Sequence, residues 1–152
     1  MRQLLGEYEC KIDAKGRMRI PSGLLGQFER SGVSFVINRG FENCLMIYPE
    51  NVWDKITEEV NSLNQYDKRN REFVRYFYRG AQKLDLDAAD RVLVSKRLLE
   101  YAEVKKDVIL AAVNDRIELW AKDKYDFMLD EEPMDFSDLA QTVLGNKLEG
   151  GN

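Results

Sequence analysis

The segment Asp13–Pro21 has the sequence DAKGRMRIP, which predicts a tight turn followed by a short strand with one buried face. The Asp13 side chain can accept a hydrogen bond from the nearby backbone, and Gly16 can adopt a positive φ without steric cost. From Arg17 to Ile20, basic and apolar residues alternate, as in a strand with a core face and a solvent face. Pro21 cannot donate a hydrogen bond to a ladder, so the strand is expected to end there.

The residues on either side of this segment complete a small structural unit. Tyr8–Ile12 is predicted as the strand that enters the turn, and Ser22 as the N-cap of a short helix whose apolar face begins at Leu24. Two buried strands are predicted further on, at Phe35–Ile37 and Leu45–Tyr48.

The same plan occurs a second time in the chain. Placing Gly6 over Gly80 brings further identical residues into register: Asp13 over Asp87, Ala14 over Ala88, Arg17 over Arg91, Leu24 over Leu98 and Leu25 over Leu99. The second copy predicts buried strands at Val108–Leu110 and Ile117–Trp120. A unit of about fifty residues buries little apolar surface alone. The two copies are therefore expected to share one core.

A helical spacer separates the copies, and an acidic tail follows them. Pro49–Arg79 predicts two helices with a break near Asn64–Asp67. The second helix carries an apolar stripe surrounded by cations: Phe73, Val74 and Phe77 with Lys68, Arg69, Arg71, Arg75 and Arg79. These cations fit a solvated face or a contact with another subunit, and direct DNA contact is the alternative. In the tail, a helix is predicted over Ser137–Leu144 and Gly145 is predicted to stop it.

Composition excludes several classes of protein. The 152 residues include two cysteines and no histidine, so Ser-His-Asp catalysis and imidazole metal sites are impossible. Cys10 and Cys44 have no partner at metal-ligand spacing, and we expect reduced, packed thiols. The longest apolar run, Val108–Val113, is too short for a membrane helix, and the first six residues do not resemble a signal peptide. We expect a cytoplasmic protein without metal, cofactor or small-molecule substrate.

The net charge of −4 argues at first against binding to nucleic acid, but the charges are distributed unevenly along the chain. Residues 1–20 hold five basic and three acidic residues, whereas residues 126–150 hold seven acidic residues and one lysine. Lys15 lies at the predicted hairpin tip, with Arg17 and Arg19 on one side of the following strand. Such cations suit phosphate contact, and an Arg fork can also bind guanine. The alternative is a solvated turn with ordinary surface charges.

The two DxxxR turns, the helix that leads into Gly80 and the chain length together resemble the MraZ family of bacterial regulators, related to the AbrB swapped-hairpin superfamily. The resemblance implies an α+β fold in which tandem swapped-hairpin AbrB-like repeats form a small β-barrel core, with a helical spacer and a C-terminal helix. The implied organisation is a first unit at 1–56, the spacer at 57–79, a second unit at 80–129 and an acidic tail at 130–152.

The resemblance also implies a function. Members of the family assemble into rings, bind direct repeats in double-stranded DNA upstream of the division and cell-wall gene cluster, and act chiefly as repressors. The implied location is the cytoplasm, in association with the nucleoid. The DNA-contacting residues carried over are Lys15, Gly16 and Arg17, then Arg19, with Arg91 from the second copy.

The second copy departs from the family pattern at two positions. Asp90 stands where a glycine is usual, and Ser95 stands where a proline is common. Aspartate tolerates the left-handed conformation better than most residues, so we expect the turn to survive. Its negative charge would repel phosphate, so we expect Arg91 to contribute less to DNA binding than Arg17.

The sequence also bears on functions other than DNA-dependent repression. For an enzyme, motifs such as the P-loop and the nucleophile elbow are absent, so we expect no catalysis. The carboxylates at 130–132 and Asp135 are more typical of a solvated tail than of a cation site, and Asp85 and Asp87 flank a turn. A ring-forming module that binds protein, or an antitoxin-like member of the same superfamily, is the alternative.

Overall fold

The computed structural model describes residues 3–28, 34–131 and 135–149, with the side chains of 146–149 excepted. The chain divides into two compact units, residues 1–122 and 123–152. The first unit holds both copies of the repeat and the spacer. The second unit is helical.

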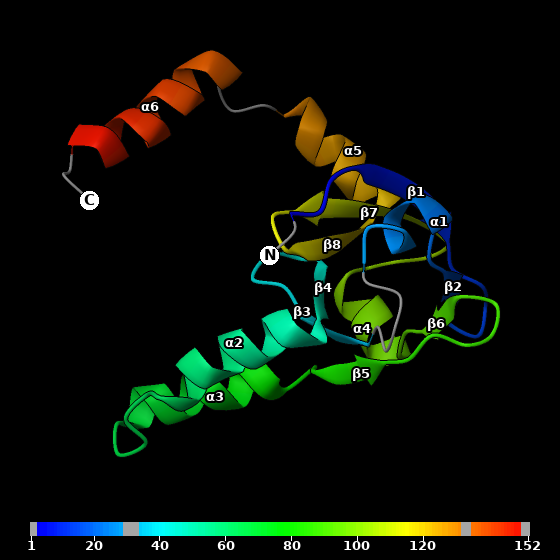
Figure 1. The fold of residues 1–152 in the computed structure, drawn as a ribbon, viewed down its shortest axis with the longest axis horizontal. Coiled ribbons are helices and arrows are strands. Elements are labelled where there is room, and N and C mark those ends of the chain that lie inside the picture. The colour runs from blue at the N-terminus through cyan, green and yellow to red at the C-terminus, as the bar shows by residue number, and fades with distance from the viewer. Residues whose placement is uncertain (1–2, 29–33, 132–134, 150–152) are drawn as a thin grey trace. The chain divides into compact units, whose positions relative to one another are not determined.

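The elements follow the order that the repeat predicts (Figure 1). The first copy contains β1 (Glu7–Lys11), β2 (Arg17–Arg19), α1 (Ser22–Leu25), β3 (Phe35–Arg39) and β4 (Leu45–Pro49). The spacer consists of α2 (Glu50–Asn61) and α3 (Lys68–Tyr78). The second copy contains β5 (Gln82–Leu84), β6 (Arg91–Leu93), α4 (Lys96–Tyr101), β7 (Asp107–Val113) and β8 (Arg116–Ala121), and α5 (Lys122–Asp130) and α6 (Phe136–Glu149) follow. The α+β class and the tandem plan are confirmed.

The two copies interlock strand by strand. A six-stranded antiparallel sheet has the order β1-β7-β8-β4-β3-β5, and β2 pairs with β6 in a separate two-stranded ribbon. Each copy thus lends strands to the other: β1 pairs with β7, β5 with β3, β4 with β8 and β2 with β6. In the described strands β1 and β5 form the edges of the six-stranded sheet, because β2 and β6 pair with each other instead of closing it.

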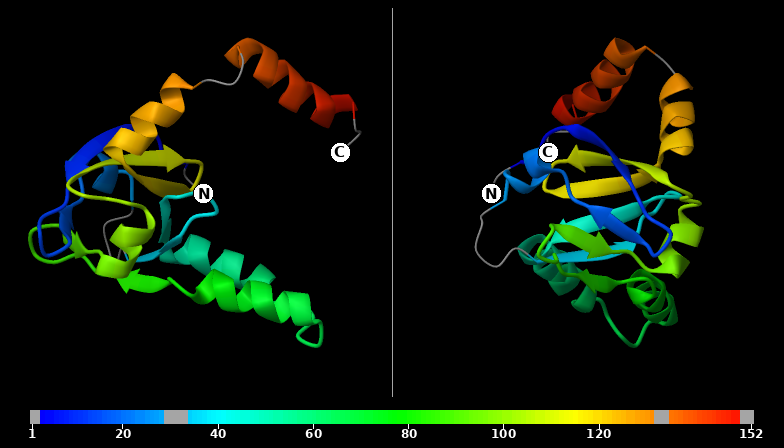
Figure 2. Two further views of the ribbon diagram at one scale, coloured as in Figure 1. Left: turned by 180° about the vertical axis from the view of Figure 1, so that it is seen from behind. Right: turned by 90° about the vertical axis from the view of Figure 1, so that its right-hand side faces the viewer.

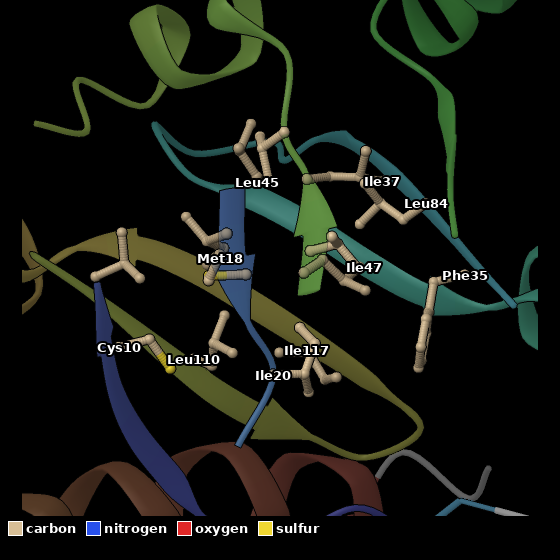
Figure 3. Packing of buried hydrophobic residues seen from close by; sticks show 14 of the residues in the cluster. Cys10, Met18, Ile20, Phe35, Ile37, Leu45, Ile47, Leu84, Leu110 and Ile117 are labelled. Atoms are coloured by element: carbon tan, nitrogen blue, oxygen red, sulfur yellow. The ribbon is translucent and has the colours of Figure 1, made fainter. Parts of the chain in front are cut away.

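The shared core lies between the ribbon and the sheet (Figure 3). Met18 and Ile20 point inward from the β2 segment and pack among residues of both copies, while Arg17 and Arg19 point outward. The alternation read from the sequence is therefore confirmed. Cys10 belongs to the same cluster, and Cys44 is also buried without a disulfide, as expected.

The ends of two helices differ from the sequence-based expectation. Ser22 is the first residue of α1, and Pro21 takes the N-cap position without a side-chain hydrogen bond. In the second copy, Ser95 does cap α4, since its hydroxyl accepts from the Leu98 amide at 3.4 Å. Gly145 does not stop α6, which runs through it to Glu149. A single glycine costs a helix interior only about 1 kcal/mol, too little to end it by itself.

The spacer forms an antiparallel helical hairpin that extends from the sheet (Figures 1 and 2). The break predicted near 64–67 is present, and Asp67 caps α3 by accepting a hydrogen bond from the Arg69 amide. Trp53 of α2 stacks on Phe77 of α3 with ring centroids 5.4 Å apart. Within the described ranges, no helix is long and apolar enough to cross a membrane.

Candidate nucleic-acid interface

The β2–β6 ribbon presents a narrow, mostly cationic outer face. Met18 pairs with Val92, and both side chains are buried beneath the ribbon. The residues on either side of this pair point outward. They are Arg17 opposite Leu93 and Arg19 opposite Arg91. Alternation along two paired strands therefore gathers three arginines and a leucine on one surface.

The turn before β2 is built by the carboxylate of Asp13. Its Oδ1 accepts hydrogen bonds from the backbone amides of Lys15 and Arg17, each at 2.9 Å. Its Oδ2 accepts from Arg17 Nε at 2.8 Å. One side chain thus fixes both the turn and the direction of the first arginine of the ribbon.

Gly16 is required at the end of this turn. It has φ of +88°, and a Cβ atom there would lie 2.5 Å from the carbonyl oxygen of Val94. The Gly16 carbonyl itself accepts from the Val94 amide at 2.8 Å, which ties the turn to the second copy. A side chain at this position would have to displace backbone of the other repeat.

The turn of the second copy has the same three hydrogen bonds to its aspartate. Asp87 Oδ1 accepts from the amides of Ala89 at 2.8 Å and Arg91 at 2.9 Å, and Oδ2 accepts from Arg91 Nε at 2.9 Å. Asp90 takes the place of Gly16 with φ of +61°, so the expected survival of the turn is confirmed. Its carbonyl accepts from the Ile20 amide, which mirrors the link from Gly16 to Val94.

Both turn carboxylates favour their charged form. The pKa of Asp13 is lowered chiefly by the hydrogen bond from the Arg17 backbone amide, and this effect together with the Arg17 side chain outweighs the opposing effect of desolvation. The pKa of Asp87 is lowered in the same way by the Arg91 amide. Hydrogen bonds to a carboxylate stabilise the ionised state, so each turn is built around a negative charge at neutral pH.

The two arginines that follow these turns are fixed by ion pairs with Asp13 and Asp87 but remain accessible to solvent. The side chains of Arg17 and Arg91 are each 40% exposed. A guanidinium has five N–H donors, so an ion pair through Nε leaves it able to bind a further acceptor such as a phosphate. Arg19 is positioned by a backbone contact and not by an ion pair, because its Nε donates to the carbonyl of Ala89 at 3.1 Å.

The copies differ in the charge that they bring to this surface. The first supplies Lys-Gly-Arg-Met-Arg at residues 15–19, and the second supplies Ala-Asp-Arg-Val-Leu at residues 89–93. Lys15 is exposed at the first turn, and alanine stands in its place in the second. The positive charge of the ribbon is therefore concentrated on the first copy.

The structure brings the sequence-predicted residues together. Arg17, Arg19 and Arg91 lie on one ribbon, and Lys15 and Gly16 lie in the turn that leads into it. Sequence reasoning missed the Asp–Arg ion pairs and Leu93. Both had a signal, because each aspartate stands four residues before its arginine and the repeat places Leu93 over Arg19.

The basic helix α3 is not part of this surface. Figure 1 and the left view of Figure 2 show α2 and α3 extending away from β2 and β6, at the other end of the unit that holds both repeats. Its C-terminal end is fastened to β3, since Asn38 Nδ2 donates to the Phe77 carbonyl at 2.6 Å and Arg39 Nη2 to the Tyr76 carbonyl at 2.8 Å. The cations of α3 therefore lie on a different surface from those of the ribbon.

The carboxylates outside the two ribbon turns form no metal-binding cluster in the described ranges. No group of three or more metal-ligating side chains that could hold an ion occurs there. Glu132 of the tail cluster lies outside the described residues. Of the pair considered at the second turn, Asp87 already uses both oxygens on Arg91 and the turn backbone.

The fold and the ribbon define a class of protein: a tandem repeat of swapped hairpins with one cationic β-ribbon. Comparison with known sequences agrees, because the family of MraZ proteins matches residues 3–76 and again 77–147. The chain belongs to the MraZ family.

Several relatives match over nearly their whole length. "Transcriptional regulator MraZ" of Christiangramia forsetii is 40% identical over 150 residues, covering 96% of each chain. Proteins of the same name are 40% identical in Flavobacterium psychrophilum, over 96% of this chain and 94% of the relative, and 34% identical in Pediococcus pentosaceus, over 92% and 96%. Transcriptional regulation, which is not an enzyme activity, is thus the class of function to which the chain belongs.

Proposed function

We propose that this protein is a sequence-specific, DNA-binding transcriptional repressor that assembles as a ring on direct repeats in double-stranded DNA. In line with its family, the proposed target lies upstream of the division and cell-wall gene cluster, and the proposed location is the cytoplasm, in association with the nucleoid. The observation that carries the proposal is the outward-facing set Arg17, Arg19 and Arg91 on the β2–β6 ribbon, with Lys15 beside it.

The ribbon has the right form for a DNA groove. A two-stranded antiparallel ribbon fits the major groove, where an arginine can bind O6 and N7 of guanine in a bidentate manner. The ion pairs with Asp13 and Asp87 hold Arg17 and Arg91 in one direction before DNA arrives. Pre-ordering of this kind reduces the entropy lost on binding.

One ribbon with three arginines, and Lys15 in the adjoining turn, should bind weakly by itself. A ring would offer several ribbons to successive repeats, and each engaged repeat raises the effective concentration for the next. Repeats about one helical turn apart would keep the ribbons on one face of the duplex. Occupation of a promoter in this way would exclude RNA polymerase.

A gel-shift titration on the DNA upstream of the protein's own gene tests the proposal. Wild type, Arg17→Ala and Arg91→Ala are compared at two salt concentrations, with Arg69→Ala, an exposed arginine of α3, as the matched control. We expect Arg17→Ala to cost about 1–3 kcal/mol per engaged ribbon and to lower the salt slope by about one. Arg91→Ala should cost less, because Asp90 lies beside it, and Arg69→Ala should cost nothing.

The alternative reading, a ring that binds protein and not DNA, predicts a different result. In that case the ring would form but would not shift the promoter fragment, and Arg17→Ala would change nothing. Binding that stays constant between low and physiological salt would also contradict the electrostatic mechanism.

A further inference from the structure

The loop between β3 and β4 holds a phenylalanine in water. The side chain of Phe41 is 92% exposed, although phenylalanine gains about 1.5–3 kcal/mol when it is buried. The backbone on either side is firmly held: the Gly40 amide donates to the Cys44 carbonyl at 2.8 Å, and the Cys44 amide to the Glu42 carbonyl at 2.7 Å.

A second set of contacts fastens this loop to the other repeat. Tyr101, at the end of α4, donates its hydroxyl to the carbonyls of Gly40 at 2.9 Å and Glu42 at 3.3 Å. Arg39 lies over the Tyr101 ring, 5.3 Å from its centroid. Phe41 is therefore an aromatic side chain on a pre-ordered backbone, which is the character of an interface hot spot.

The fold itself does not require this loop. In the second copy, the equivalent strands β7 and β8 are joined by a two-residue turn, Asn114-Asp115, between the paired residues Val113 and Arg116. Phe41 has no counterpart there. It is one of the features that make the two halves of the molecule unequal.

The helical spacer formed by α2 and α3 carries a recess. A cavity of about 560 Å³ lies between α2 and α3, a volume within the range of about 300–1,000 Å³ that binding pockets have. Its lining is formed by Val60, Asn61, Leu63, Gln65, Asn70, Arg71, Val74 and Arg75. Although α3 is amphipathic, none of its residues is buried. Its apolar face is thus only partly covered by α2.

We propose that Phe41 of one copy inserts into the α2–α3 recess of a second copy, and that this contact links the subunits of the ring. The inference rests on the proposed function, since it names the joint of that assembly. The lining includes the apolar side chains of Val60, Leu63 and Val74, which suit an aromatic ring.

Charge complementarity supports the same occupant. Glu42 follows Phe41 and is exposed, whereas Arg71 and Arg75 line the recess. Arg71 is held beside it by donating from Nη1 to the Gln65 carbonyl at 2.9 Å. A docked Phe41 would bring the Glu42 carboxylate to these guanidinium groups.

The geometry of the contact is compatible with a ring. The projecting residue and the recess lie on different elements, so each copy can receive one neighbour and enter another. Such head-to-tail contacts form a ring when the rotation between neighbouring copies closes, and an open filament when it does not. The β2–β6 ribbon takes no part, so every subunit keeps its ribbon available for DNA. In this contact, Arg71 and Arg75 of α3 would pair with Glu42 in the β3–β4 loop of the neighbouring copy.

Sedimentation velocity of the full-length protein tests the contact. We expect Phe41→Ala, and Val74→Arg in the recess, each to shift the ring to monomer. Phe136→Ala, which removes another exposed phenylalanine, should leave the ring intact. Far-ultraviolet circular dichroism and the unfolding midpoint establish that each variant is folded.

Mixing the variants gives the decisive result. Phe41→Ala retains the recess and Val74→Arg retains the phenylalanine, so an equimolar mixture should form dimers and nothing larger. Likewise, Glu42→Arg and Arg75→Glu should each weaken assembly, and the double variant should regain it. A ring that survives Phe41→Ala, or a mixture that stays monomeric, overturns the proposed contact.

The outcomes separate this inference from the proposed function. A ring that persists in Phe41→Ala and still shifts promoter DNA refutes the contact and leaves the function standing. A monomeric Phe41→Ala protein that binds repeats as tightly as wild type supports the contact and refutes the avidity mechanism. A wild-type protein that is itself monomeric refutes both the ring and its joint.

Discussion

Met18 of β2 and Val92 of β6 are direct partners in the ribbon, and they occupy equivalent positions in the two copies of the repeat. Arg17 faces Leu93 and Arg19 faces Arg91. Since the repeat places Arg17 over Arg91 and Arg19 over Leu93, the Met18–Val92 pair marks a local two-fold axis. The outer face would carry four arginines if the repeat were perfect, and it carries three.

Restoring the fourth arginine should strengthen DNA binding. Leu93 is 61% exposed on the outer face, so Leu93→Arg adds a cation without disturbing the core. We expect tighter binding to the promoter repeats and a salt slope steeper by about one per engaged ribbon. Leu93→Gln, which adds polarity without charge, is the control, and equal slopes for the two variants would contradict the assignment of the ribbon.

The two turns should respond differently to substitution. Gly16→Ala places a Cβ atom 2.5 Å from the Val94 carbonyl at a positive φ, so we expect a loss of at least about 1–2 kcal/mol in the free energy of unfolding. Asp90→Gly, at the matching position, should change that free energy by less than about 1 kcal/mol, because aspartate already tolerates its φ of +61°. Urea unfolding measures both, and equal losses would refute the argument.

Acid should weaken the turns through Asp13 and Asp87. Their pKa values are lowered in the folded protein, so the stability that they contribute is present above the unfolded carboxyl pKa of about 3.9. It is lost as the pH falls through the folded pKa. Carbon-detected NMR titration should show both carboxyls ionising below the ordinary aspartate range.

A variant pair checks this sign. Asp13→Asn should be less stable than wild type at neutral pH, and the difference should shrink in acid, where the wild-type carboxyl is protonated as well. Asp85→Asn, which alters an exposed carboxylate two residues before Asp87 in the second copy, serves as the control. A difference that grows as the pH falls would be the opposite of the expected behaviour.

The thiols should be unreactive in the folded protein. Burial raises the pKa of Cys10 to about 11 and that of Cys44 to about 12, with nearby glutamates adding to the effect. At pH 8, about one thiol in a thousand or fewer would be ionised. We expect labelling by a thiol reagent to be more than about 100-fold slower in native buffer than in guanidinium chloride, and equally fast labelling would show that the core opens readily.

Local signals predicted much of this structure because they act over a few residues. The DAKGRMRIP segment and its second copy placed both turns, the break near Asp67 placed the spacer hairpin, and alternation assigned Met18 to the core. Two helix ends were predicted wrongly from the sequence. The helix α1 begins one residue earlier than expected, with Pro21 and not Ser22 at the N-cap position. The helix α6 continues through Gly145, because the low helix propensity of one glycine costs too little free energy to end a helix.

The sequence alone determined the repeat, the segregation of charge and the residue types at each turn, because these are properties of short segments and of their order along the chain. Only the tertiary structure decided which strands pair between copies, that Leu93 stands beside Arg17 and that Phe41 remains in water. Those relationships join residues far apart in the chain, and they follow from how two half-cores fit together, which no local pattern encodes.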